Sequence, residues 1–157
     1  MLLGNGDGTF QAPINTSTGG NLGLLAIADL NGDDYVDVLG GYGTVLYVFL
    51  GKGDGTLKPG VPYNLEASLS GTISITDVNG DGKQDVVYNV WVSTTLQQEV
   101  IVLLGNGDGK LQTPVTSAGL PDLPVETVVG DFNGDGKLDL VARVTCNCST
   151  PYSVYFS

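Results

Sequence analysis

The chain has 157 residues, 41% of them hydrophobic, which suffices for one domain with a core, and no apolar run reaches the roughly twenty residues of a membrane helix. Its 17 acidic residues outnumber six scattered basic ones, so we expect neither nucleic-acid binding nor membrane insertion. Histidine, the commonest general base, is absent and most carboxylates are concentrated in three loops, so we do not expect an enzyme.

The chain begins with a turn that recurs twice further on. Residues 1–3 resemble the end of a third strand and residues 9–15 a fourth strand, with Gly-Asn-Gly-Asp-Gly between them at 4–8. The same turn, with one Asn replaced by Lys, lies at 51–55 and again in its first form at 105–109. Glycines at alternate positions supply the positive φ that tight turns need, so these three glycine turns predict hairpins.

Two complete units and one incomplete unit follow. Each is a series of short apolar segments with no sustained 3.6-residue period, which indicates strands and no substantial helix. The predicted strands are 22–28, 36–41, 44–50 and 56–63, then 71–76, 84–91, 99–104 and 110–116, then 125–130, 138–144 and 152–156.

Repeats of about fifty residues with four antiparallel strands each are typical of β-propeller blades. We therefore predict one all-β domain over residues 1–157, with three repeats and a split terminal blade. Its parts are the fourth strand of a split blade at 1–21, blades at 22–68 and 69–118, and an incomplete three-stranded blade at 119–157.

An acidic loop joins the first two predicted strands of each unit. The three acidic loops are DLNGDDYVD at 29–37, DVNGDGKQD at 77–85 and DFNGDGKLD at 131–139. Acidic side chains at positions one, five and nine and an amide at position three have the spacing of oxygen ligands for Ca²⁺, with a backbone carbonyl at position seven. The predicted ligands of three calcium ions per chain are Asp29, Asn31, Asp33, Tyr35 and Asp37; Asp77, Asn79, Asp81, Lys83 and Asp85; and Asp131, Asn133, Asp135, Lys137 and Asp139.

The sixth position of the acidic loops predicts a sharp turn. Gly82 and Gly136 occupy it in the second and third loops, whereas the first loop has Asp34, so we expect the first loop to be the most strained. An EF-hand is disfavoured because position twelve is Gly40, Tyr88 or Ala142 instead of the bidentate Glu, and because strands rather than amphipathic helices flank the loops.

Together, the acidic loops and the glycine turns resemble FG-GAP/VCBS repeats, which form the blades of integrin α-subunit propellers and fungal propeller lectins. The resemblance covers nearly the whole chain. It implies a calcium-stabilised, secreted β-propeller, with adhesion or glycan binding as the usual task. Family propellers have six or seven blades, whereas this chain has three repeats.

The ends of the chain are complementary, since the first unit has only a fourth strand and the last unit lacks one. We expect completion of the split blade by another chain, giving either a closed six-bladed dimer or a head-to-tail fibre. Two alternatives stay open: a propeller that binds a glycan or protein ligand, and an accessory domain excerpted from a larger secreted protein.

A few single residues carry weaker signals. Cys146 and Cys148 could form a strained disulfide or remain reduced, and Asn15 and Asn147 match the N-glycosylation pattern. Strand aromatic residues are expected to pack between blades rather than to stack on sugars. These aromatic residues are Tyr47, Phe49, Tyr88, Trp91 and Tyr152.

Overall fold

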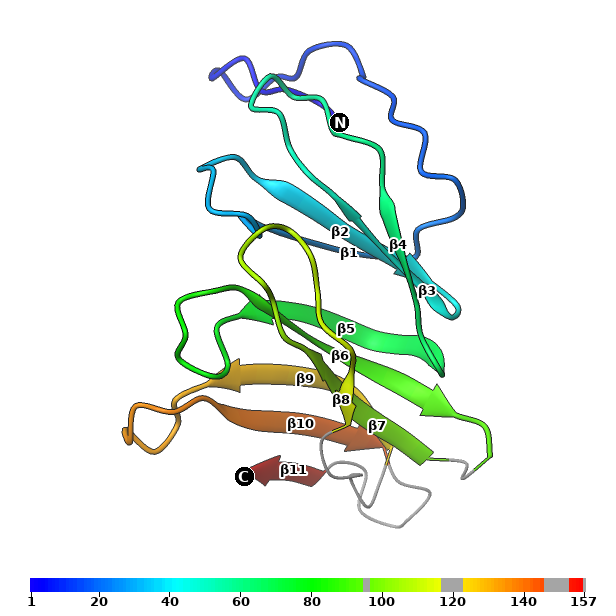
Figure 1. The fold of residues 1–157 in the computed structure, drawn as a ribbon, viewed down its shortest axis with the longest axis vertical. Coiled ribbons are helices and arrows are strands. Elements are labelled where there is room, and N and C mark those ends of the chain that lie inside the picture. The colour runs from blue at the N-terminus through cyan, green and yellow to red at the C-terminus, as the bar shows by residue number, and fades with distance from the viewer. Residues whose placement is uncertain (95–96, 117–122, 146–152, 157) are drawn as a thin grey trace.

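The computed structural model describes residues 1–94, 97–116, 123–145 and 153–156 (Figure 1). These residues form eleven β-strands in three antiparallel sheets, and no helix occurs among them. The prediction of an all-β chain is therefore confirmed. Since the described residues contain no helix, they contain none that could cross a membrane.

Within each sheet the strands pair in chain order, each with its neighbour in the sequence. The first sheet contains β1 (Leu24–Ala28), β2 (Asp37–Tyr42), β3 (Val45–Phe49) and β4 (Val61–Asn64). The second contains β5 (Ser68–Thr76), β6 (Asp85–Val92), β7 (Gln97–Leu103) and β8 (Val115–Thr116). The third contains β9 (Leu123–Gly130), β10 (Asp139–Thr145) and β11 (Ser153–Phe156).

The three sheets stack in chain order along the long axis of the molecule (Figure 1). Between successive sheets the first strands pack against one another, β1 against β5 and β5 against β9. The N-terminal residues lie at one end of the stack and β11 at the other, so the two chain ends are far apart (Figure 1).

The fourth strands are shorter than predicted. β4 begins at Val61 rather than residue 56, β8 has only two residues, and residues 1–23 contain only an isolated bridge between Gly4 and Phe10 in place of the strand expected at 9–15. The predicted segments contain Pro13 in the first, Pro59 and Pro62 in the second, and Pro114 in the third. Proline has no N–H to donate, so Pro59 and Pro114 interrupt the ladder just before β4 and β8, whereas Pro62 is tolerated within β4 because β4 is the edge strand of its sheet.

β5 is longer than predicted, because it starts at Ser68 instead of residue 71. Its pairing with β6 shifts register between Ser70 and Ile73. Gly71 lies within this shift with φ of 75°, a conformation that glycine adopts without a steric penalty. The strand therefore continues through a β-bulge where the sequence suggested a boundary.

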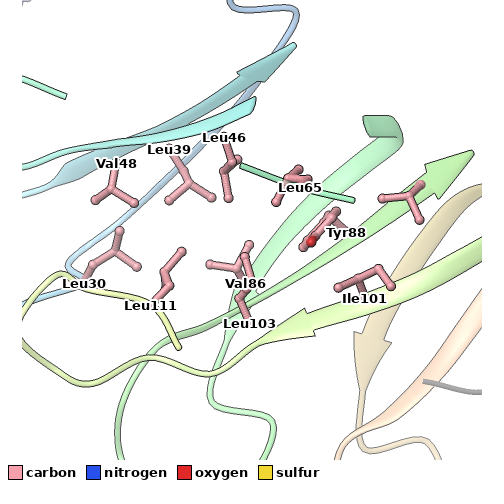
Figure 2. Packing of buried hydrophobic residues seen from close by; sticks show 11 residues of the cluster. Leu30, Leu39, Leu46, Val48, Leu65, Val86, Tyr88, Ile101, Leu103 and Leu111 are labelled. Atoms are coloured by element: carbon pink, nitrogen blue, oxygen red, sulfur yellow. The ribbon is translucent and has the colours of Figure 1, made fainter. Parts of the chain in front are cut away.

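The main hydrophobic core lies between the first and second sheets (Figure 2). Alternate side chains of β2 and β3 face alternate side chains of β6 and β7, as period-two strands require. The buried members of this core are Leu30, Leu39, Leu46, Val48, Leu65, Val86, Tyr88, Val90, Ile101, Leu103 and Leu111. Tyr88 is only 1% exposed, which confirms the expected packing role of this aromatic residue.

The contact between the second and third sheets is more polar. The hydroxyl of Thr127 donates to Oδ1 of Asn89 at 3.2 Å, and its N–H donates to the hydroxyl of Thr72 at 3.3 Å. Asn89, Thr127 and Ala142 are all buried. The two contacts between successive sheets thus use different side-chain chemistry.

Candidate metal centres

The three acidic loops occupy equivalent places in the three sheets. Each joins the first strand of its sheet to the second: β1 to β2, β5 to β6, and β9 to β10. In Figure 1 all three project along the same edge of the stack. The fold therefore repeats the predicted site three times, once per sheet.

The first Asp of each loop is surrounded by backbone N–H groups. Its carboxylate accepts hydrogen bonds from the fourth, fifth and sixth residues, which wrap around it. The shortest pairs are Gly32 N and Asp34 N to Asp29, both 2.8 Å; Gly80 N and Gly82 N to Asp77, 2.8 and 2.7 Å; and Gly134 N and Gly136 N to Asp131, 2.6 and 3.0 Å.

In the first and third loops these donors keep the first carboxylate ionised. The N–H groups of Gly136 and Gly134 hold the pKa of Asp131 below its usual value. At Asp29 desolvation raises the pKa, but the combined N–H groups, led by that of Asp34, outweigh it, so the pKa is again lowered. Each of these loops therefore carries a full negative charge at its centre near neutral pH.

The third and fifth residues are organised by the same kind of local bond. Each third-position Asn accepts from the N–H of the fifth residue through Oδ1, at distances of 2.9 to 3.0 Å. Each fifth-position Asp accepts from the N–H of the seventh residue, at 2.8 to 3.0 Å. In Asp81 this N–H, from Lys83, is the main cause of a lowered pKa. These side chains lie on the solvent side of the loop.

The sixth residue is left-handed in every loop. Gly82 and Gly136 have φ of 82° and 83°, and Asp34 has φ of 65°. Asp34 is the one residue other than glycine with positive φ in the part of the chain that the structure describes. The prediction that the first loop is the most strained agrees with this backbone conformation, since an L side chain is disfavoured there.

The ninth residue lies on the inner side of the loop. Asp37 is fully buried; its Oδ2 accepts from Leu30 N at 2.9 Å, and its Oδ1 accepts from Gly51 N at 2.7 Å. Asp85 is also fully buried and accepts from Val78 N at 3.0 Å and Gly105 N at 2.8 Å.

The ninth Asp therefore links the start of its acidic loop to the start of the next glycine turn. In the third loop, Asp139 accepts from Phe132 N at 3.0 Å. This bond is equivalent to those that Asp37 accepts from Leu30 N and Asp85 accepts from Val78 N. Sequence reasoning assigned these residues only as metal ligands and missed the link. The sequence does contain a signal for this link, namely the glycine that recurs at the start of each glycine turn.

The seventh residue, predicted to offer its carbonyl, also contacts the glycine turn. A Cβ at Gly53 would come within 2.4 Å of the Tyr35 ring, and one at Gly107 would come within 3.1 Å of Cδ of Lys83. The glycines of the turns therefore leave room for these side chains. Acidic loop and glycine turn form one packed unit in the first and second sheets.

The donor atoms fit a hard cation in chemistry. The fifteen predicted ligands supply carboxylate, amide and carbonyl oxygens, and these suit Ca²⁺ or Mg²⁺ better than a transition metal. A carboxylate that accepts backbone N–H bonds keeps further lone pairs for a cation.

Within the described residues, however, no three Asp, Glu, His or Cys side chains are gathered as a preformed metal cluster. The structure brings the first, third and fifth residues together around the loop backbone and turns the ninth inward.

Stacked antiparallel sheets, each with an acidic loop between its first and second strands, define an all-β repeat protein. The model of the FG-GAP-like repeat matches residues 29–88 and 77–142, so the chain belongs to the FG-GAP-like repeat family. The resemblance that the acidic loops suggested is thereby confirmed. A search of curated proteins found no match to the chain.

The remaining predicted sites are less informative. Asn15 is exposed, as a glycosylation site requires. Asn147, Cys146 and Cys148 lie outside the described residues, so their pairing and modification stay predictions.

Proposed function

We propose that this chain is an extracellular calcium-binding repeat module, not an enzyme, whose sheets are blades of a β-propeller and whose acidic loops each hold one Ca²⁺. The observation that carries this proposal is the repetition of one loop conformation in three sheets. In each loop the same N–H groups surround the first Asp, and a left-handed residue occupies the sixth position. The extracellular location rests on what is typical of FG-GAP repeats.

Bound Ca²⁺ would offset the repulsion between the carboxylates of one loop. It would also hold the loop that connects the first two strands of each sheet, and so stabilise the folded chain by mass action. The protein's own part is to preorganise the ligands: the N–H groups fix the first Asp and the third-position amide oxygen before any ion arrives.

The proposal is tested by calorimetric titration with Ca²⁺ and by melting curves in Ca²⁺ and in a chelator. We expect three sites per chain and a higher Tm in Ca²⁺. Asp81→Asn and Asp135→Asn should each remove one site, because each replaces an exposed fifth-position carboxylate. Asp108→Asn, in a glycine turn, is the matched control and should keep all three. An identical melt in Ca²⁺ and chelator would refute calcium binding.

A second candidate function, head-to-tail self-assembly, is favoured by the outer face of the first sheet. Leu25 and Ile27 of β1 are 66% and 68% exposed. Their equivalents one repeat later, Ile73 and Ile75, are packed against the core between the first and second sheets. At the other end of the stack Val128 is 55% exposed on the outer face of the third sheet.

A second copy of the chain is the occupant we propose for these faces, because stacking it on either end would continue an interface that the chain already uses between its own sheets. Sedimentation velocity over a concentration series tests this. We expect a dimer or longer assembly that Ile27→Lys disrupts and that Val61→Lys, at an exposed position of β4, does not. A monomer at all concentrations would contradict self-assembly and leave the calcium proposal intact.

A further inference from the structure

A cavity of about 250 Å³ lies between the second sheet and the chain segment that enters it from the first sheet. The face of β6 and β7 forms its floor through Tyr88, Val90 and Ile101, and Glu66 and Ala67 of the segment before β5 form its roof. Thr94 at its mouth follows β6, at the opposite end of that strand from the acidic loop.

Tyr88 contributes a polar group that the protein leaves without a partner. Its side chain is 1% exposed and lies between Leu65 and Ile101 in the view of Figure 2. Its hydroxyl makes no hydrogen bond within the described part of the chain, where the buried side-chain atoms without a partner are Ser70 Oγ and Asn89 Nδ2, so the Tyr88 hydroxyl is reached by solvent through the cavity that it lines. Burial, with a contribution from the charge of Glu66, raises the pKa of Tyr88 to about 12, so the phenol is neutral at physiological pH. The cavity therefore presents an unused hydroxyl that can accept or donate.

Two carboxylates share this cavity and no basic residue lines it. Glu66 is exposed at the rim, and Glu99 of β7 is half-buried and lies opposite Val90 of β6. Glu66 and Tyr88 line the same cavity. The remaining lining is largely apolar, with Val92 and Pro114 beside the carboxylates. A ligand that fits must be positive at one end and apolar along its length.

We propose that this cavity binds a primary alkylammonium group, either a small free amine or the end of a lysine side chain of a partner. The ammonium would donate to Glu66, Glu99 and the Tyr88 hydroxyl, three acceptors for its three N–H groups. Its methylene chain would lie against Val90 and Ile101. A metal ion is a poorer fit, because the described lining offers two carboxylates, whereas Ca²⁺ takes roughly six to eight oxygen ligands.

Trp91 allows a direct test, because it is the only tryptophan and lines a neighbouring pocket together with Glu66 and Ala67. Its fluorescence is followed while n-butylammonium or Nα-acetyl-lysine amide is added at constant ionic strength and constant Ca²⁺. We expect a saturable change with at least one of them, and none with n-butanol. A response to n-butylammonium alone would assign the site to free amines. A response to both n-butylammonium and Nα-acetyl-lysine amide would show that a lysine side chain also fits.

Glu66→Gln and Glu99→Gln should weaken the binding by roughly tenfold or more, the loss expected for one charge-assisted hydrogen bond. Glu66 is exposed, so its variant should fold normally, and melting curves verify this for both. Asp7→Asn, which removes the same charge from a distant glycine turn, is the control and should bind as the parent does.

Three results would overturn the proposal: no saturable change with either amine, an equal response to n-butanol, or equal weakening by Asp7→Asn. Saturation by Ca²⁺ that Glu66→Gln and Glu99→Gln abolish would assign the cavity to a metal instead. None of these results bears on calcium binding by the acidic loops, which Asp81→Asn and Asp135→Asn test separately.

Discussion

At the scale of single residues, position nine of the acidic loops has two possible roles. Asp85 is a predicted calcium ligand, and it is also a fully buried carboxylate that accepts from Val78 N and Gly105 N. Asp81, at position five of the same loop, is exposed and bonds only within its own loop. Removing Asp85 therefore affects the fold itself, whereas removing Asp81 affects only the loop.

We predict that Asp85→Ala lowers the free energy of unfolding by about 3 kcal/mol in a chelator, because one buried and one partly buried N–H group lose their acceptor. Asp81→Ala should cost less than about 0.5 kcal/mol under the same conditions, as exposed polar substitutions usually do. Urea denaturation followed by circular dichroism measures both. Equal effects of the two variants without metal would show that the buried link contributes nothing to stability.

At the scale of elements, the second and third glycine turns are each fitted to the acidic loop of their own sheet. A Cβ at Gly105 would lie 2.1 Å from the carbonyl oxygen of Gln84, and a Cβ at Gly51 would lie 2.4 Å from that of Val36. Gly4 is the equivalent residue of the first turn, where no acidic loop precedes it, and a Cβ there would meet nothing within 4 Å. The same motif is therefore under steric constraint in two copies and free in the third.

Gly105→Ala should therefore destabilise the protein by roughly 2 to 3 kcal/mol, the usual cost of forcing an extra carbon into a packed site against backbone. Gly4→Ala, the matched substitution, should change stability by less than about 0.5 kcal/mol. Thermal melts of the two variants side by side provide the measurement. If Gly105→Ala melts with the parent protein, the close contact between turn and loop is not required.

At the scale of elements, part of the fold could be predicted from the sequence and part could not. Short apolar segments without a 3.6-residue period predicted the first three strands of each sheet. The fourth strands were overestimated, since Pro59 and Pro114 remove ladder donors close to where pairing was expected. The acidic loops could be predicted because their hydrogen bonds join residues that are close together in the sequence. The link from Asp85 to Gly105 spans twenty residues and depends on strand pairing, and the cavity beside Tyr88 depends on the stacking of two sheets.

At the scale of the whole molecule, the charge distribution makes stability depend on acid. The net charge is −11, and the acidic loops contain most of the carboxylates. Backbone N–H groups lower the pKa of Asp29, Asp81 and Asp131 in the folded chain. Each lowered pKa means that the unfolded chain binds a proton more readily than the folded chain does. Acid therefore favours unfolding even when no metal is bound.

We predict that, in metal-free buffer, Tm is constant between about pH 7 and pH 5 and falls below about pH 4. The contribution of these carboxylates is fully present above their unfolded pKa, near 3.9, and is lost as the pH drops through their lower folded pKa. Melts at a series of pH values measure the slope. Asp131→Asn removes one of the titrating groups and should make the fall shallower, whatever its effect on Tm at pH 7. A Tm that rises on acidification would show that repulsion among the carboxylates outweighs the N–H groups that hold them.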